Sequence, residues 1–309
     1  MNNSKSYISL IQQIIQKTGW PQSRLAEEVG VSFATVNRWL NGHTKPHPGQ
    51  LRRIEQVFKA VVGIAPVPLE DIAGLFKKIA AQRKRFPDIG KCLRDQRIVE
   101  EFLLELTYHS DAIEGSTLTK RQTEAVLFDK AVIKDKGLIE HLEAANHAVI
   151  LREIFQGGFS GPVMEEMIKS IHKALMQGIR EDAGMYARFH RGIRGVDLVL
   201  PAPQDIPEEM AVLCQRINRG RGHPIEHIAQ MHADFEAVHP FSDGNGRVGR
   251  LLMIVQLIQQ GFAPCLITVE RKAQYYESLE YAQKKSPTHL ARFVAEAVLG
   301  GYEVVRKYA

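Results

Sequence analysis

The strongest constraint on the fold is a pair of helical stretches joined by a short loop that contains glycines. Before the loop, apolar residues recur at helical spacing, namely Ile225, Ile228, Met231, Phe235 and Val238. Pro240 then ends this helix, because proline lacks the amide hydrogen that a helix interior requires. After the loop, a second helical pattern continues through Val248, Leu251, Leu252, Val255 and Ile258. The sequence therefore predicts a helix, a loop and a second helix that starts at the loop.

Helical periodicity of this kind dominates the whole chain. Strand-like text is scarce, and its best case is residues 196–200. We therefore predict an all-α fold with one small β-hairpin. Three parts are expected, at residues 1–65, 66–155 and 156–309. Residues 63–68 contain two prolines and are expected to link the first part to the second.

Composition narrows the class of protein. The 309 residues are 44% hydrophobic and 24% charged, which is ordinary for a globular chain. The three cysteines, Cys92, Cys214 and Cys265, are far apart and odd in number, which favours reduced thiols over a disulfide framework. We expect no secretory leader, and the apolar run at residues 251–258 is too short to span a bilayer. We expect a cytoplasmic protein with no membrane partner.

The net charge of +5 is concentrated at one end of the chain. Residues 1–65 hold eight basic and three acidic side chains, and the rest of the chain is balanced. Such asymmetry indicates a polyanionic partner for the first part, although a solvated basic face would look the same.

Residues 21–46 read as two helices joined by a tight turn. Gly30 can end the first helix in the left-handed conformation, and Ser32 is a good N-cap for the second. The stretch LAEEVGVSFATVNRWLNGHTKP resembles the Cro/repressor helix-turn-helix family. The resemblance implies that the second helix enters the major groove of duplex DNA. It also implies that the protein can bind DNA as a homodimer. The alternative is a helical hairpin used for protein contacts. The expected DNA-contacting residues are Ser32, Phe33, Thr35, Asn37 and Arg38.

The loop between the two long helices has the chemistry of a phosphate site. Gly244 and Gly246 let backbone N–H groups converge, and the helix that follows adds the positive end of its dipole. Arg247 and Arg250 add planar cations suited to phosphate. The combination predicts a site for an oligophosphate.

Two further residues of this loop indicate group transfer. Asp243 offers a hard oxygen ligand that suits Mg²⁺ shared with phosphates. His239 stands at the entrance of the loop and can accept a proton near neutral pH. Phosphate binding, metal binding and a base within a few residues together predict transfer of a group at phosphorus.

Rival interpretations of the loop are a dinucleotide site, a zinc site and a purely structural turn. A dinucleotide site built on Gly244, Gly246 and Gly249 would need a preceding strand, whereas the preceding text is helical. A zinc site built on His227, His232 and His239 lacks an HExxH motif and any cysteine partner.

The run HPFSDGNGRVGR matches the Fic family motif HxFx(D/E)GNGRxxR throughout, and the resemblance extends over roughly residues 70–305. It implies a Fic-type helical core in which His239 is the general base for a target hydroxyl and Phe241 anchors the loop. Asp243 would hold Mg²⁺. ATP would be the co-substrate, and AMP would pass to a tyrosine, serine or threonine of a target protein. The resemblance assigns the phosphates to Gly244, Asn245, Gly246, Arg247 and Arg250.

Related reactions stay open. The Doc kinases of the same group have lysine in place of Gly246 and lack the second arginine, so this sequence favours AMP transfer over phosphorylation. Transfer of UMP or phosphocholine is also compatible with the motif. A different class of function is a DNA-binding regulator whose Fic domain senses nucleotide without turnover. The intact His239 favours the enzyme.

Upstream, SDAIEG at residues 110–115 resembles the inhibitory pattern (S/T)xxxE(G/N) of the family. Ser110 and Glu114 are i and i+4 on one helix face, and Gly115 can end that helix. The resemblance implies that Glu114 pairs with Arg250 and occupies the place of the γ-phosphate. In some members the same glutamate supports removal of AMP, so the reverse reaction is possible.

Two more segments carry expectations from the resemblance. Residues 184–203 resemble the hairpin flap that holds the target segment, and their extra arginines leave the target preference open. Tyr275 and Tyr276 resemble the segment near the nucleoside, although adjacent tyrosines are also common in a core and its rim.

Overall fold

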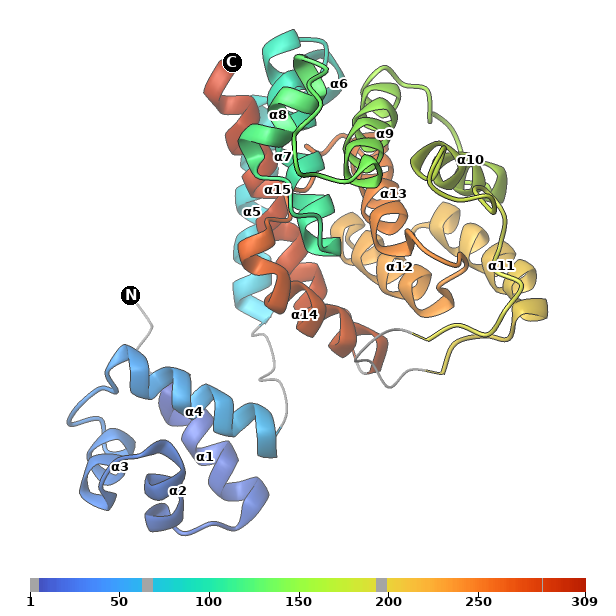
Figure 1. Cartoon of the computed structure of the whole chain (residues 1–309). Coiled ribbons are helices and arrows are strands. Elements are labelled where there is room, and N and C mark those ends of the chain that lie inside the picture. The colour runs from blue at the N-terminus through green and yellow to red at the C-terminus, as the bar shows by residue number, and fades with distance from the viewer. Residues whose placement is uncertain (1–5, 63–68, 193–198, 285) are drawn as a thin grey trace. The chain divides into compact units, whose positions relative to one another are not determined.

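The computed structural model describes residues 6–62, 69–192, 199–284 and 286–309, and the chain divides into two compact units, Met1–Val67 and Pro68–Ala309. The described residues contain helices and no strand, as the all-α prediction requires (Figure 1). None of the helices in these ranges is long and apolar enough to cross a membrane. The predicted linker at residues 63–68 lies outside the described residues.

The first unit is a cluster of helices around a small core. Trp39 is buried at its centre, and α1 packs along α4. Gly30 ends α2 with φ 75° and ψ 40°, and the Ser32 hydroxyl accepts the Thr35 amide hydrogen at 3.3 Å. The predicted helix-turn-helix is therefore confirmed in its turn and in its cap. The helices are α1 (Ser6–Thr18), α2 (Gln22–Val29), α3 (Phe33–Leu40) and α4 (Pro48–Val61).

The second unit contains the remaining helices. Their first group is α5 (Leu69–Arg85), α6 (Ile89–Cys92), α7 (Gln96–Glu114), α8 (Lys120–Phe128), α9 (Leu138–Phe155) and α10 (Glu165–Leu175). The second group is η1 (Pro203–Asp205), α11 (Ile206–Arg219), α12 (Pro224–Val238), α13 (Asn245–Gln259), η2 (Val269–Arg271), α14 (Lys272–Lys284) and α15 (Thr288–Tyr308).

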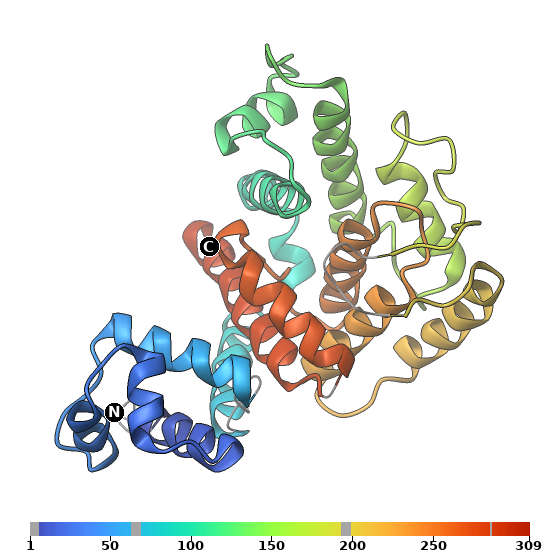
Figure 2. The same ribbon diagram turned by 60° about the horizontal axis from the view of Figure 1, so that its bottom comes forward.

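The helix α13 lies at the centre of this unit. Most of its residues are buried, and it contacts α7, α10 and α12 (Figures 1 and 2). The long helix α15 packs on α12 and on α5. Burial of α13 on several sides explains why its apolar residues are not confined to one stripe. The loop that precedes α13 is thereby held between α7, α10 and α12.

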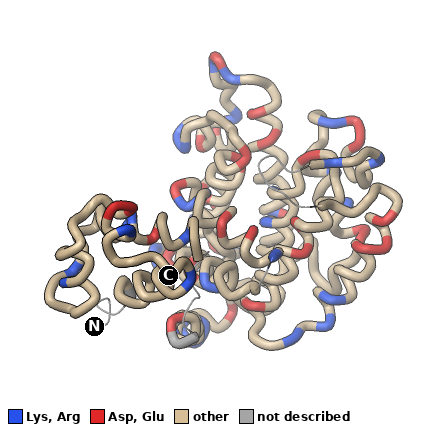
Figure 3. Tube along the Cα trace, turned by 90° about the horizontal axis from the view of Figure 1, so that it is seen from below, with Lys and Arg blue, Asp and Glu red and all other residues tan. Residues whose placement is uncertain are grey.

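Charges are distributed differently in the two units. Acidic and basic residues are interspersed over the helices of the second unit, whereas the first unit has few acidic residues, so its basic residues are not balanced (Figure 3). The expected flap at residues 184–203 contains no strand in its described parts, and residues 193–198 of it lie outside the described residues.

Candidate active site

The loop between α12 and α13 is shaped by two residues with positive φ. His239 ends α12 with φ 49° and ψ 58°, a left-handed conformation that is uncommon for a residue other than glycine. Gly244 adopts φ 77° and stands directly before α13. The two turns bring the catalytic candidate His239 and the start of α13 to one side of the unit.

Side chains inside the loop hold its form. The amide oxygen of Asn245 accepts the Phe241 amide hydrogen, and its amide nitrogen donates to the Phe241 carbonyl, both at 2.8 Å. Asn245 is buried, so its side chain fixes the turn rather than pointing to solvent. Phe241 is fully buried, as expected of an anchor.

His172 of α10 joins the loop to the next segment. Its ring stacks on Phe241 at 3.8 Å between centroids. Its Nδ1 accepts the Gly184 amide hydrogen at 2.8 Å, so the proton lies on Nε2, which donates to the Asp243 carbonyl at 3.1 Å. Burial lowers the pKa of His172 to about 4, so the ring is neutral at pH 7. No sequence signal points to this role, because a histidine on an apolar helix face is common in cores.

The two arginines of the motif are buried beside the loop. Arg247 is 3% exposed and Arg250 is 4% exposed. Among the described residues, Nε of Arg247 and Nη1 of Arg250 have no hydrogen-bond partner. A buried donor without a partner costs about 1–3 kcal/mol, which a bound anion would recover. Both side chains are therefore suited to oxygen atoms of a phosphate chain.

Carboxylates surround Arg247. Its Nη1 is 2.6 Å from Oε1 of Glu143 and 4.0 Å from Oδ1 of Asp111, and its Nη2 is 4.0 Å from Oδ1 of Asp243. Burial raises the pKa of Asp111 to about 7, against the opposing charge of Arg247. Glu143 was not predicted, since it lies on α9, far from the motif in sequence.

Arg250 is held by the end of α7. Its Nη2 donates to Oε1 of Glu114 at 2.7 Å, and its Nε donates to the Ser110 hydroxyl at 3.1 Å. Partial burial raises the pKa of Glu114, but the charge of Arg250 outweighs this effect and keeps the pKa below its usual value. Gly115 ends α7 with φ 110°, as predicted. A methyl group on Gly246 would collide with Oε1 of Glu114, so the missing side chain there gives the carboxylate its place.

His239 presents one ring nitrogen to the interior. Its Nδ1 is buried, 3.7 Å from Oε2 of Glu236, and it has no hydrogen-bond partner among the described residues. Burial lowers the pKa of His239 to about 4, so the imidazole is neutral at pH 7 and can accept a proton. Arg191 donates to the carbonyls of His239 and Pro201, at 2.8 and 3.2 Å, and so ties the segment before η1 to the end of α12.

Asp243 is a carboxylate of the loop itself, and its Oδ1 lies 4.0 Å from Nη2 of Arg247. Its side chain is 56% exposed, and its Oδ1 accepts the Gly244 amide hydrogen at 2.7 Å. No group of three or more metal-ligating side chains occurs among the described residues. A single carboxylate fits Mg²⁺, which takes one or two from a protein and completes its shell with phosphate oxygens and water.

The predicted nucleoside residues lie in different surroundings. Tyr275 is 1% exposed, and its hydroxyl lies 2.7 Å from Nε2 of His232. Arg250 stands over the Tyr275 ring, 5.9 Å from its centroid. Tyr276 is 39% exposed and is free to present its ring at the surface. Of the two, Tyr276 is the one that a base could reach directly.

In the first unit, the residues expected at DNA lie along α3 and its cap. Phe33 is 54% exposed, and Arg38 is exposed as well. Thr35 shares a hydrogen bond with Ser32 at 2.9 Å between the two hydroxyls. Asn37 donates to the Gln22 side chain at 3.4 Å, so α2 partly holds it.

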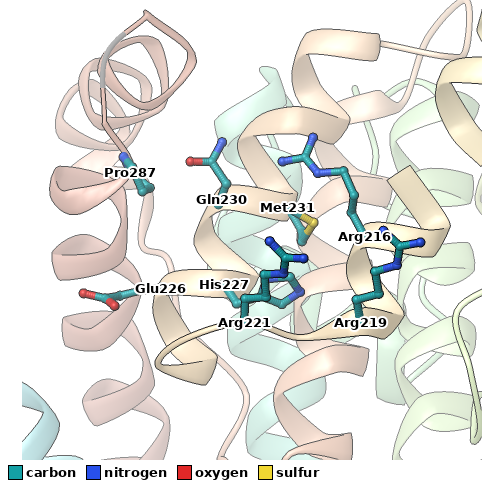
Figure 4. A pocket seen from close by; sticks show the side chains of 8 residues that line it. All are labelled: Arg216, Arg219, Arg221, Glu226, His227, Gln230, Met231 and Pro287. Carbon is teal, nitrogen blue, oxygen red and sulfur yellow. The ribbon is translucent and has the colours of Figure 1, made fainter. Parts of the chain in front are cut away.

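A separate hollow of about 410 Å³ lies between the ends of α11 and α12 (Figure 4). None of the residues of the loop motif lines it. Arg216 and Arg219 belong to the last turn of α11, where cations complement the negative end of the helix dipole, and Arg216 also pairs with Asp234 at 2.6 Å. These contacts account for Arg216 and Arg219 without a ligand, and the hollow lies apart from the loop motif.

Two segments of the chain match known protein families. Residues 162–257 match the Fic/DOC family, and residues 11–61 match a helix-turn-helix family. "Protein adenylyltransferase Fic" of Nematostella vectensis is 32% identical over 206 residues, which cover 65% of this chain and 48% of that protein. "Protein adenylyltransferase fic-1" of Caenorhabditis briggsae is 28% identical over 229 residues, covering 72% and 45%.

Solved structures agree in fold. The C. elegans Fic-1 fragment superposes with a TM-score of 0.68 at 22% identity, covering 96% of this chain and 98% of that one. A Fic domain protein of Bacteroides thetaiotaomicron gives 0.64 at 23% identity, covering 77% and 99%. The chain spans about half the length of the curated relatives it matches.

Proposed function

We propose that the protein transfers AMP from ATP to a hydroxyl group of another protein, because residues 162–257 match the Fic/DOC family. The names of its relatives support this reaction. The observation that carries the proposal is the pair of buried arginines beside the loop, each with a guanidinium N–H that lacks a partner among the described residues. Arg247 and Arg250 would take the oxygens of the β- and γ-phosphates.

Residues of the loop and of α13 have different roles in the proposed reaction. His239 takes the proton of the target hydroxyl on Nε2 as the oxygen bonds to the α-phosphorus. The bond from that phosphorus to the oxygen bridging the α- and β-phosphates breaks, and pyrophosphate carries away the electron pair. The N–H groups at the start of α13 and the two arginines stabilise the negative charge, so catalysis is mainly positioning and electrostatics.

Mg²⁺ belongs to the same proposal. Asp243 would hold the ion through the carboxylate oxygens that remain exposed at the mouth of the loop. When bound, the ion neutralises charge on the phosphates. The loop carbonyl of Asp243 is held by His172, so the backbone that carries this ligand is fixed.

Regulation follows from the pairing of Glu114 with Arg250. In the described state, one N–H group of Arg250 is engaged by Glu114 instead of a γ-phosphate. We propose that this state is a restrained form of the enzyme, and that displacement of Glu114 admits ATP in the productive position. A nucleotide sensor without turnover is the alternative, and it would have no use for the base His239.

Incubation with ATP labelled on the α-phosphate tests the reaction. Label should enter protein in the presence of the Glu114→Gly variant and should stay at background with Glu114→Gly combined with His239→Ala. ATP labelled only on the γ-phosphate should give no incorporation, which separates AMP transfer from phosphorylation. Equal incorporation with and without His239 would contradict the assignment of the base.

For the first unit, we propose that it binds duplex DNA through Arg38 and neighbouring residues of α3. The match of residues 11–61 to a helix-turn-helix family and the net charge of +5 on residues 1–65 support it. Exposed Phe33 and Arg38 on α3 would face the major groove. A homodimer would extend the number of base pairs that are read.

A further inference from the structure

A buried carboxyl group lies directly behind the proposed base. Glu236 stands on α12, one turn before His239, and is 5% exposed. Its Oε2 is 3.7 Å from Nδ1 of His239, which is just beyond a hydrogen bond. Among the described residues, neither Oε1 of Glu236 nor Nδ1 of His239 has a hydrogen-bond partner. The oxygen nearest to His239 is Oε2, whereas the unpartnered Oε1 lies beside Gly249 and His232. Nδ1 of His239 is thus a buried nitrogen that a small movement toward Oε2 would pair.

The space for this carboxyl is made by a residue that the phosphate chemistry does not use. A methyl group on Gly249 would stand 2.7 Å from Oε1 of Glu236 and 2.9 Å from Cε1 of His232. Gly249 is inside α13, where glycine costs about 1 kcal/mol relative to alanine. The glycine thus has a packing reason, namely that it lets Glu236 and His232 lie against the face of α13.

We propose that Glu236 positions His239 by holding its imidazole in the tautomer with the proton on Nδ1, so that Nε2 is free to accept the proton of the target hydroxyl. The catalytic part of this inference rests on the proposed function. A neutral imidazole carries one proton, and only the tautomer with a bare Nε2 can act as a base from that nitrogen. Hydrogen bonds of this kind are often long in the resting state and shorten in the reacting complex.

In the described state Glu236 is mostly protonated at pH 7, and it can still accept that proton through the carbonyl oxygen of the neutral acid. Burial raises the pKa of Glu236 to about 8, the charge of Arg250 lowers it, and the charge of Glu114 raises it. When Glu114 moves away from Arg250, its charge no longer raises the pKa of Glu236. A larger fraction of Glu236 is then in the carboxylate form. The groups that face Glu236 are His232 and His239 of the same helix and its end, Arg250 of α13, Glu114 of α7, and Tyr275 and Tyr276 of α14.

Glu236→Gln tests the proposal, because glutamine keeps the shape but can never become the negatively charged, acceptor-only carboxylate that favours a proton on Nδ1. The full chain, with ¹⁵N-labelled histidine, is compared by NMR as wild type and as Glu236→Gln, and His239→Ala assigns the ring signals. We expect the ¹⁵N shifts of His239 to move from the Nδ1–H pattern toward the Nε2–H pattern in Glu236→Gln. Glu226→Gln, a carboxyl in the first turn of the same helix, is the matched control and should leave them unchanged.

Kinetics on the Glu114→Gly background give the second measurement. Adding Glu236→Gln should lower kcat about 100-fold, the range of a lost general base, while KM for ATP stays unchanged. Thermal melting checks that the variant is folded. A His239 spectrum that is the same in Glu236→Gln and wild type would overturn the proposal, whatever the rates are. If no variant transfers AMP at all, the proposed function fails, and the NMR comparison still decides the role of Glu236.

Discussion

The carboxylate of Glu114 and the guanidinium of Arg250 are joined by a hydrogen bond of 2.7 Å between Oε1 and Nη2, across 136 positions of sequence. Arg250 is buried, whereas the Glu114 side chain keeps 30% of its surface exposed. The arginine is therefore a fixed part of the core, and the glutamate is the partner that can leave. Solvent can reach the Glu114 side of this ion pair, as the proposed displacement of Glu114 requires.

Removing Glu114 and removing Arg250 should have opposite effects. Glu114→Gly should raise AMP transfer about 10- to 100-fold, since a hydrogen bond to a charged group contributes about 1.5–3 kcal/mol. Arg250→Ala also breaks the bond but removes the phosphate contact, so transfer should stay low. The double variant should behave as Arg250→Ala. The measurement is AMP incorporation at one ATP concentration.

A matched control for this series is Glu124→Gly, which removes an exposed carboxylate from α8. It should leave the rate at the wild-type level. If Glu114→Gly and wild type incorporate AMP equally, Glu114 is an ordinary charge at a helix end.

His172→Phe should destabilise the second unit by about 1–3 kcal/mol. Phenylalanine keeps the stacking on Phe241 but leaves the Gly184 amide hydrogen and the Asp243 carbonyl without their partner. Urea denaturation measures the effect, and His190→Phe, at an exposed position, is the control. A His172→Phe variant as stable as wild type would show that the loop does not depend on these bonds.

Asp111→Asn should change how stability depends on pH. Burial raises the folded-state pKa of Asp111 to about 7, against an ordinary value of 3.8. Between about pH 4 and pH 7 the unfolded chain has therefore lost this proton while the folded chain keeps it, so raising the pH favours unfolding. The wild-type free energy of unfolding should fall across this window relative to that of Asp111→Asn.

Thermal melts of the two proteins at several pH values measure this difference. The other buried carboxyl, Glu236, is present in both and cancels in the comparison. A constant difference between the two proteins from pH 4 to pH 7 would mean that Asp111 is ionised in the folded state, paired with Arg247.

Local signals in the sequence were enough for several helix boundaries in both units. Gly30 and Gly115 mark helix ends because a left-handed residue is needed there, and Ser32 marks a helix start through its hydroxyl. The motif likewise located Arg247 and Arg250, since both lie at fixed spacing from the glycines. These features depend on neighbours within a few positions, which is the range that a sequence pattern can show.

Partners from distant segments could not be predicted in this way. Glu143 contacts Arg247, and His172 holds the Asp243 carbonyl, but each comes from another helix with no fixed spacing to the motif. Arg191 lies in the expected flap, and its bonds to the carbonyls at the end of α12 depend on the fold. Long-range packing decides these contacts.

The last prediction concerns the first unit. Arg38→Ala should weaken binding of duplex DNA and lower the slope of log affinity against log salt by about 0.9, because each phosphate contact releases counterions. Arg38 is exposed on α3. The side-chain hydrogen bonds of its neighbours Asn37 and Asn41 do not involve it. Arg53→Ala is the matched control, since its guanidinium already donates to the Glu28 carbonyl at 2.9 Å. It should change the slope less than Arg38→Ala. Binding of promoter DNA that is insensitive to salt in all three proteins would contradict a phosphate contact by α3, and the basic residues of this unit would then be a solvated face.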